Sequence, residues 1–303
     1  MSCLGFDTSN YTTSVAIFKD GKYKNVRKLL PVKNGERGLR QSDALFHHVK
    51  QLPEVISKLE TGNIKSVGVS TRPRSVEGSY MPVFLAGLSF AETAAKVLEV
   101  PLYKFSHQDG HIMAGIISSG SYELLEEDFI CVHLSGGTSE ILKARYNGYN
   151  FDVDIVGGTL DISAGQAIDR VGVSFGLDFP CGAELERLAL NADSVVKLPV
   201  SVKDGYFNFS GLETKALGFK EQNIESLSKG LFSAVGETVS RAINFVCKSY
   251  NINKILVVGG VASNGIIRNI LTDSSENMFY FASTELSSDN ACGIAALADR
   301  AWR

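Results

Sequence analysis

Residues 3–18, CLGFDTSNYTTSVAIF, and residues 129–145, FICVHLSGGTSEILKAR, follow one plan. In each, an apolar run leads into a short polar turn, and a second apolar run follows it. Such runs have the length of buried strands, so each stretch predicts a β-hairpin. Two hairpins opening two halves of one chain predict a duplicated domain with a cleft between its lobes. Turns that offer hydroxyl and backbone N–H groups can cradle a phosphate.

Amphipathic stretches lie between the strand-like runs. An alternation of strands with helices indicates an α/β fold. Two segments, Val26–Gln41 and Asn191–Tyr206, are predicted to be loops. The predicted helices are Ala44–Leu59, Gly87–Leu98, Ile162–Phe175, Ser226–Ser249 and Asn290–Trp302.

The composition fits a folded protein with two lobes. The 303 residues are 44% hydrophobic, which excludes general disorder, and they suffice for two lobes of roughly 130–170 residues. The formal net charge of −3 argues against strong nonspecific nucleic-acid binding by the chain alone. The 29 glycines stand beside only 7 prolines, which indicates tight turns or backbone held close to a ligand.

The cysteines and the N-terminus indicate a reducing compartment. The five cysteines are far apart and form no C-x-x-C pair. The N-terminal residues lack the charged start and apolar stretch of a signal peptide. The longest apolar region, Tyr80–Leu98, is interrupted by Gly87, Glu92 and Lys96, so no membrane span is expected. We therefore expect a cytoplasmic protein.

His107 and His111 are spaced four residues apart. On a helix this spacing points both imidazoles to one face, where they can bind a single metal ion. Two ordinary surface or core histidines are the alternative. Asp289 opens the last helical stretch, where it can be a simple N-cap or can complete a His–His–carboxylate site. Such a site suits Fe(II) and Zn(II) about equally.

Two glycine turns follow buried strands. Ser135–Ser139 and Val257–Asn264 predict close approach of backbone to a phosphate or ribose, or else ordinary tight turns. Asp161 and Asp169 belong to a helical stretch that is either functional or a solvated face. Phe207–Leu212 is either a short aromatic strand or a lid turn.

In this order the motifs resemble the TsaD family, also called the glycoprotease or O-sialoglycoprotein endopeptidase family. The resemblance runs almost from end to end. The segments that carry it are Leu4–Ser9, His107–His111, Leu134–Ser139, Ala164–Asp169, Gly176–Gly182, Phe209–Leu212, Gly259–Asn264 and Ser288–Asn290. It implies an α/β chain with a duplicated actin-like, sugar-kinase-like (ribonuclease H-like) two-lobe fold and an interlobe cleft. The implied domains are an N-terminal lobe at 1–127, a C-terminal lobe at 128–288 and a helix at 289–303 that returns to the N-terminal lobe.

The resemblance also implies a reaction. Family members move a threonylcarbamoyl group from its adenylate to N6 of a tRNA adenosine and release AMP. By resemblance, His107, His111 and Asp289 are the catalytic metal ligands, for one Fe²⁺ or Zn²⁺ per chain. The implied adenine nucleotide is threonylcarbamoyl-AMP, AMP or ATP, and TsaB-like and TsaE-like proteins, with a homodimer or heterodimer, are the implied partners. The implied nucleotide- or substrate-binding residues are Ser135, Gly136, Gly137, Thr138, Ser139, Asp169, Gly182, Glu184, Gly260 and Asn264.

The chain also departs from the family pattern. Tyr11 and Thr12 stand where an acidic pair is usual, Thr138 replaces a histidine, and Cys181 replaces a glycine. The family's glycine-rich loop before the histidine pair is rewritten at residues 72–82, and two basic residues are replaced as well, a lysine by Glu213 and an arginine by Gly265. These changes favour an alternative, a diverged nucleotide-binding paralog without tRNA-modifying activity, which assists assembly or uses another acceptor.

Two further alternatives come from the motifs. A protease fits poorly, because the histidine pair lacks the glutamate of H-E-x-x-H and Asp109 is its only acidic residue. A small-molecule kinase stays open, since phosphate-binding turns alone do not distinguish a kinase from a transferase.

Overall fold

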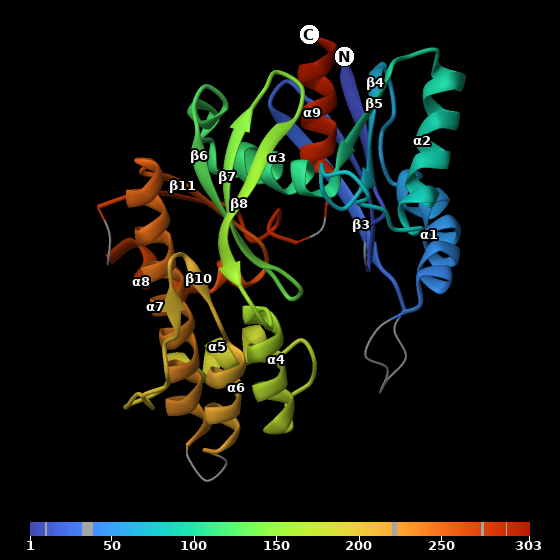
Figure 1. The fold of residues 1–303 in the computed structure, drawn as a ribbon. Helices are drawn as coiled ribbons and strands as arrows, with labels where there is room; N and C mark the ends of the chain where they lie inside the picture. Colours follow the sequence, from blue (N-terminus) through green and yellow to red (C-terminus); the bar gives the residue numbers. More distant parts are fainter. Residues whose placement is uncertain (10, 32–38, 220–222, 274–275, 289) are drawn as a thin grey trace. The chain divides into compact units, whose positions relative to one another are not determined.

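The computed structural model spans the chain as two compact units. Unit 1 comprises Met1–Glu126, Tyr146–Asp152 and Ser288–Arg303, and unit 2 comprises Glu127–Arg145 and Val153–Ser287. This division differs from the predicted lobes mainly at Tyr146–Asp152. The segment is the tip of a hairpin whose strands lie mostly in unit 2, but the tip itself belongs to unit 1. The structure describes all residues except 10, 32–38, 220–222, 274–275 and 289 (Figure 1).

Unit 1 is built on a five-stranded sheet in the order β3-β2-β1-β4-β5. The hairpin predicted at the start of the chain is present, with β1 antiparallel to β2, and β2 is antiparallel to β3. On the other side, β4 pairs parallel to β1 and β5 parallel to β4. The strands are β1 (Ser2–Asp7), β2 (Thr12–Lys19), β3 (Lys22–Leu29), β4 (Ile64–Arg72) and β5 (Leu102–Ser106).

Helices cover both faces of this sheet (Figure 1). On one face, Leu4 and Phe6 of β1 pack in a core with α1 and α2. Alternation along the strand turns Gly5 to the other face, where a Cβ would lie only 2.6 Å from the carbonyl oxygen of Ala291. This close approach lets α9 pack directly on the sheet. The helices are α1 (Gln41–Ile56), α2 (Phe84–Leu98), α3 (His107–Ser119), the 3₁₀ turn η1 (Tyr122–Leu125) and α9 (Cys292–Trp302).

Unit 2 repeats the plan of unit 1. Its sheet has the order β12-β11-β6-β7-β8-β10-β9. The run β8-β7-β6-β11-β12 matches β3-β2-β1-β4-β5, with β6 antiparallel to β7, and with β11 parallel to both β6 and β12. The strands are β6 (Phe129–Leu134), β7 (Ser139–Tyr146), β8 (Phe151–Thr159), β9 (Val202–Lys203), β10 (Tyr206–Phe207), β11 (Lys254–Val258) and β12 (Met278–Phe281).

The predicted duplicated α/β fold is therefore confirmed by strand order and direction. In unit 2 the sheet and helices share one apolar core, to which the 27-residue helix α7 contributes many buried side chains. The helical elements are α4 (Ala164–Ser174), α5 (Gly182–Leu190), α6 (Ser210–Leu217), α7 (Ile224–Tyr250), the 3₁₀ turn η2 (Val261–Ser263) and α8 (Gly265–Asp273).

Three details of the sequence prediction are wrong. The end of the edge strand β3 falls in the predicted loop Val26–Gln41, because this strand is mostly charged and exposed and so carries no apolar run. The short strand β9 lies within the second predicted loop. The last helix begins at Cys292 rather than Asn290, since the Asn290 side chain accepts a hydrogen bond from the Cys292 N–H (3.0 Å).

Within the described part of the chain, no helix is both long enough and apolar enough to cross a membrane.

Candidate functional site

Helix α3 begins at the first histidine of the predicted pair. Ser106 is its N-cap, and a capping box joins it to Asp109, with the Ser106 hydroxyl accepting from the Asp109 N–H (3.0 Å). This cap fixes the start of the helix, so His107 and His111 occupy its first two turns. The His111 residue is buried, with 6% of its surface exposed.

The two imidazoles converge. The Nε2 atoms of His107 and His111 lie 2.9 Å apart, and the rings meet edge to face at an angle of 71°. Two nitrogens this close can bind one ion, because Zn–N bonds are about 2.0–2.1 Å long. The residues therefore fit a metal centre. Among the described residues no group of three His, Cys, Asp or Glu side chains surrounds this point, and the predicted third ligand, Asp289, lies outside them.

Asp7, at the end of β1, contacts His107 at Nδ1, the ring nitrogen that does not face His111. Its Oδ2 lies 2.8 Å from His107 Nδ1. Its Oδ1 accepts hydrogen bonds from the Ser9 N–H (3.0 Å) and the Ser70 hydroxyl (2.7 Å). In the sequence, Asp7 stands out only as part of the opening strand. The signal that could have found it is its place at the carboxyl end of a strand, next in the sheet to β4.

The role of Asp109 is structural rather than catalytic. Its Oδ2 accepts from the Ser106 N–H (2.8 Å), the Ser106 hydroxyl (2.6 Å) and the Ser75 hydroxyl (2.9 Å). Its Oδ1 accepts from the Phe151 N–H (3.2 Å), and the residue is buried. A carboxylate so fully occupied by donors is poorly placed to act as a general base. This geometry speaks against the protease alternative.

In unit 2, the predicted turn Ser135–Ser139 is closed by its own first residue. The Ser135 N–H donates to the Thr138 carbonyl (2.8 Å), and the Thr138 N–H donates to the Ser135 hydroxyl (3.0 Å). A Cβ on Gly136 or Gly137 would meet no atom within 4 Å. These two glycines therefore leave the turn open to a ligand.

Helix α4 packs directly on this turn. A Cβ on Gly165 would lie 2.5 Å from the Gly136 Cα, so only glycine permits the contact. The Ser163 hydroxyl donates to the Gly136 carbonyl (2.7 Å), and the Ala164 N–H donates to the Ser139 hydroxyl (2.9 Å). The turn and the N-terminus of α4 thus form one rigid element, and a helix N-terminus favours an anion.

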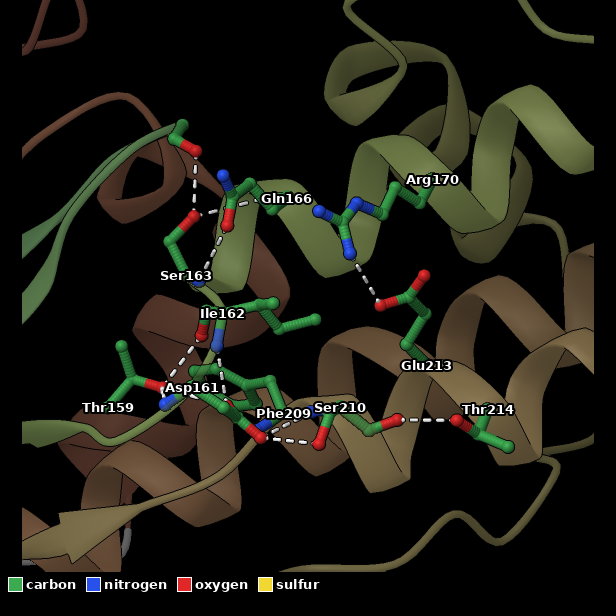
Figure 2. A network of polar contacts seen from close by, with 11 residues as sticks. Thr159, Asp161, Ile162, Ser163, Gln166, Arg170, Phe209, Ser210, Glu213 and Thr214 are labelled. Atoms are coloured by element: carbon green, nitrogen blue, oxygen red, sulfur yellow. Dashed lines mark hydrogen bonds and ion pairs between the residues drawn. The ribbon is translucent and has the colours of Figure 1, made fainter.

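The side chain of Asp161, just before α4, connects the segment that leads into this helix to the start of α6 (Figure 2). Its carboxylate accepts from the Phe209 N–H (2.9 Å), the Ser210 N–H (3.0 Å) and the Ser210 hydroxyl. Partial removal from water would raise the pKa of Asp161, but the hydrogen bonds from Ser210, Phe209 and Ile162 outweigh this effect. They hold the pKa well below its usual range.

We expect Asp161→Ala to lower the free energy of unfolding by about 2 kcal/mol. This value allows for the exposure of Asp161, because solvent weakens the contribution of its hydrogen bonds. Because the pKa is lowered on folding, the stabilisation is full above the unfolded pKa of about 3.9 and is lost as the pH falls through the folded value. Urea unfolding at neutral and acid pH checks this. Asp193→Ala, at an exposed residue, is the control, and equal stability of the two variants would contradict the expectation.

Asp169, Gly182 and Glu184 lie at the junction of α4 and α5. Asp169 Oδ1 accepts from the Cys181 N–H (2.8 Å), and burial raises the pKa of Asp169 although this hydrogen bond lowers it. Gly182 opens α5, while Glu184 is exposed and bound to Arg187 (2.9 Å). Cys181 is buried with its side chain against Gly172.

The second predicted glycine turn follows β11. Gly259 has a φ of +101°, and a Cβ there would lie 2.2 Å from the Leu134 carbonyl oxygen. A Cβ on the neighbouring Gly260 would meet no atom within 4 Å. Asn264 accepts through its side chain from the Ile267 N–H (3.0 Å), while its Nδ2 is buried with no hydrogen-bond partner among the described residues. A buried amide donor of this kind fits a ligand oxygen or ring nitrogen.

Two positions predicted to depart from the family pattern have local partners. Glu213 of α6 forms an ion pair with Arg170 of α4 (3.2 Å; Figure 2). The backbone N–H of Gly265 donates to Glu186 (2.6 Å). Of the replaced acidic pair, Thr12 begins β2 and is buried. The surrounding fold thus accommodates Glu213, Gly265 and Thr12.

Comparison with known proteins identifies the family. The model of the TsaD family, described as tRNA N6-adenosine threonylcarbamoyltransferase, matches residues 35–296. The chain belongs to this family. The tRNA N6-adenosine threonylcarbamoyltransferase of Thermosipho africanus is 30% identical over 97% of this chain and 92% of its own length. A probable bifunctional tRNA threonylcarbamoyladenosine biosynthesis protein of Methanothermobacter thermautotrophicus is 29% identical over all of this chain, which spans 56% of that protein.

Solved structures agree on the fold. Component A of the (R)-2-hydroxyglutaryl-CoA dehydratase of Acidaminococcus fermentans superposes with a TM-score of 0.59 at 15% identity, over the whole of both chains. A ROK-family glucokinase of Streptomyces griseus reaches 0.56 at 11% identity, over 99% of this chain and 98% of its own. At such identities the likeness concerns the fold alone, and it confirms the actin-like, sugar-kinase-like class. The metal and nucleotide assignments to single residues stay predictions.

Proposed function

We propose that the chain is a metal-dependent transferase of this family. It moves a threonylcarbamoyl, or a related carbamoyl, group from an adenylate donor to N6 of a tRNA adenosine. The observation that carries the proposal is the 2.9 Å convergence of His107 and His111 at the start of α3, in a chain of this family. The capped start of α3 places both histidines on its first two turns.

His107 and His111, with Asp289 as the predicted third ligand, would hold one Fe²⁺ or Zn²⁺. When bound, the ion would supply Lewis-acid polarisation of the donor's mixed anhydride, so little protein nucleophile would be needed. In unit 2, the turn Ser135–Ser139 would lie against the adenylate, because Gly136 and Gly137 leave the space beside it open. The buried Nδ2 of Asn264 would donate a further hydrogen bond to it.

The partners follow from the family. We propose that TsaB-like and TsaE-like proteins assist this chain, as a homodimer or heterodimer, with tRNA as the acceptor. The bifunctional name of the Methanothermobacter relative supports a function shared with a second domain.

The test combines the protein, its partner proteins, the donor adenylate and unmodified tRNA. Nucleoside mass spectrometry should then detect threonylcarbamoyl adenosine. The Thermosipho africanus relative, assayed under the same conditions, is the positive control. Absence of the product where that relative makes it would sink the proposal.

A second candidate is a nucleotide-binding paralog that modifies no tRNA. The Arg170–Glu213 ion pair favours this second candidate. At position 213 the family resemblance implies a lysine, whose positive charge can contact RNA phosphates, whereas this chain has an acidic side chain. This candidate predicts that adenine nucleotide binds while no partner combination yields modified adenosine.

We expect Asn264→Ala to weaken adenine-nucleotide binding about tenfold, because it removes the buried Nδ2 donor, which has no hydrogen-bond partner among the described residues. Calorimetric titration with AMP measures this change. Asn191→Ala, at an exposed residue after α5, is the matched control and should bind as wild type does. Equal affinities for all three proteins would remove Asn264 from the nucleotide site.

A further inference from the structure

The two oxygens of Asp7 have different neighbours, and this difference fixes where protons sit. Oδ1 faces the Ser9 N–H (3.0 Å) and the Ser70 hydroxyl (2.7 Å), whereas Oδ2 faces His107 Nδ1 (2.8 Å). Asp7 is 1% exposed. In so dry a position, each contact has to match a donor with an acceptor.

With Asp7 ionised and both imidazoles neutral, these contacts assign each proton. An ionised carboxylate only accepts, so the proton of the Asp7–His107 contact sits on His107 Nδ1. A neutral imidazole with a proton on Nδ1 has a lone pair on Nε2. The 2.9 Å contact between the histidines then runs from the His111 Nε2–H to the His107 Nε2.

We propose that Asp7 is the positioning residue of the metal centre: it fixes His107 in the Nδ1–H tautomer and so directs the Nε2 lone pair toward the ion. The proposal rests on the metal-dependent function proposed above. Asp7 meets His107 on the side opposite Nε2, so it acts through the histidine and not as a ligand. Carboxylates that hold a ligating histidine in this way typically raise metal affinity 10- to 100-fold.

The variant Asp7→Asn distinguishes a positioning role of Asp7 from a merely structural role. The Ser9 N–H can only donate, so it requires the amide oxygen of Asn in the place of Oδ1. The NH₂ group then faces His107 Nδ1, which has to accept, and the imidazole proton moves to Nε2. A protonated Nε2 cannot bind a metal ion. The variant should therefore carry the wrong tautomer as well as a weaker site.

The primary measurement is the ¹⁵N–¹H spectrum of the imidazoles in the metal-free protein at about pH 8. The expected result is an Nδ1–H signal for His107 in the wild type and an Nε2–H signal in Asp7→Asn. The second measurement is Zn²⁺ affinity by competition with a chromogenic chelator. We expect Asp7→Asn to bind Zn²⁺ about 10- to 100-fold more weakly than wild type.

The matched control is Asp299→Asn, a buried carboxylate of α9 that is bound to Lys65 (2.8 Å) and lies in the same unit. It should lose stability with no change in the His107 tautomer. A wild-type His107 protonated on Nε2, or an Asp7→Asn protein with unchanged Zn²⁺ affinity, would overturn the proposal. Because the wild-type spectrum needs neither metal nor a folded variant, it decides the matter even where Asp7→Asn does not fold. A wild type that shows the Nδ1–H signal but binds no Zn²⁺ would instead count against the proposed function.

Discussion

His111→Ala is expected to lower threonylcarbamoyl transfer about a thousandfold and to remove bound metal. Loss of one of two converging nitrogens leaves the ion without its predicted coordination. A metal Lewis acid supplies several kcal/mol of stabilisation to a transition state, and every 1.4 kcal/mol is tenfold in rate. The measurements are the metal content of the purified protein and the initial rate of product formation.

The control for this variant is His47→Ala. His47 lies on α1 and meets Phe46 edge to face, at a centroid distance of 5.7 Å. Its removal should change neither metal content nor rate. Full transfer activity in His111→Ala would show that the histidine pair takes no part in the reaction.

Gly293→Ala is expected to lower the free energy of unfolding by about 3 kcal/mol. Helices α3 and α9 pack so closely that a Cβ at Gly293 would lie 1.9 Å from the Gly110 carbonyl oxygen and 2.7 Å from the Ala114 backbone nitrogen. Both contacts are backbone atoms, so the helices have to separate. Since Gly110 lies between the two histidines of α3, Zn²⁺ affinity should fall as well.

Urea unfolding measures the cost, with Gly62→Ala as the control. A Cβ at Gly62 would meet no atom within 4 Å, so the control should stay within about 0.5 kcal/mol of wild type. If Gly293→Ala is as stable as Gly62→Ala, the close packing of α3 on α9 is wrong.

The sequence predicts contacts that are local and misses those that are distant. The histidine pair could be found because four residues on a helix suffice to bring the two rings together. The contact of Asp7 with His107 could not, because the two residues are 100 positions apart and only the pairing of β1, β4 and β5 brings them together. The Arg170–Glu213 pair joins two separate helices and has no local signal either.

Apolar patterning explains which strands were predicted. The paired hairpins β1–β2 and β6–β7 alternate buried runs with polar turns, and both are present. β3 forms eight pairs with β2, yet its sequence is charged because it is an exposed edge strand. The glycine excess was informative at particular positions, where Gly5, Gly165 and Gly293 permit contacts that any side chain would prevent.

The most direct test of the account is a metal titration of the transfer reaction. The protein is freed of metal with a chelator and returned to its partners, donor adenylate and tRNA, and Fe²⁺ or Zn²⁺ is added in steps. Nucleoside mass spectrometry follows the modified adenosine. We predict that product rises with added metal and levels off at one ion per chain. Full product formation by the metal-free protein would contradict the account.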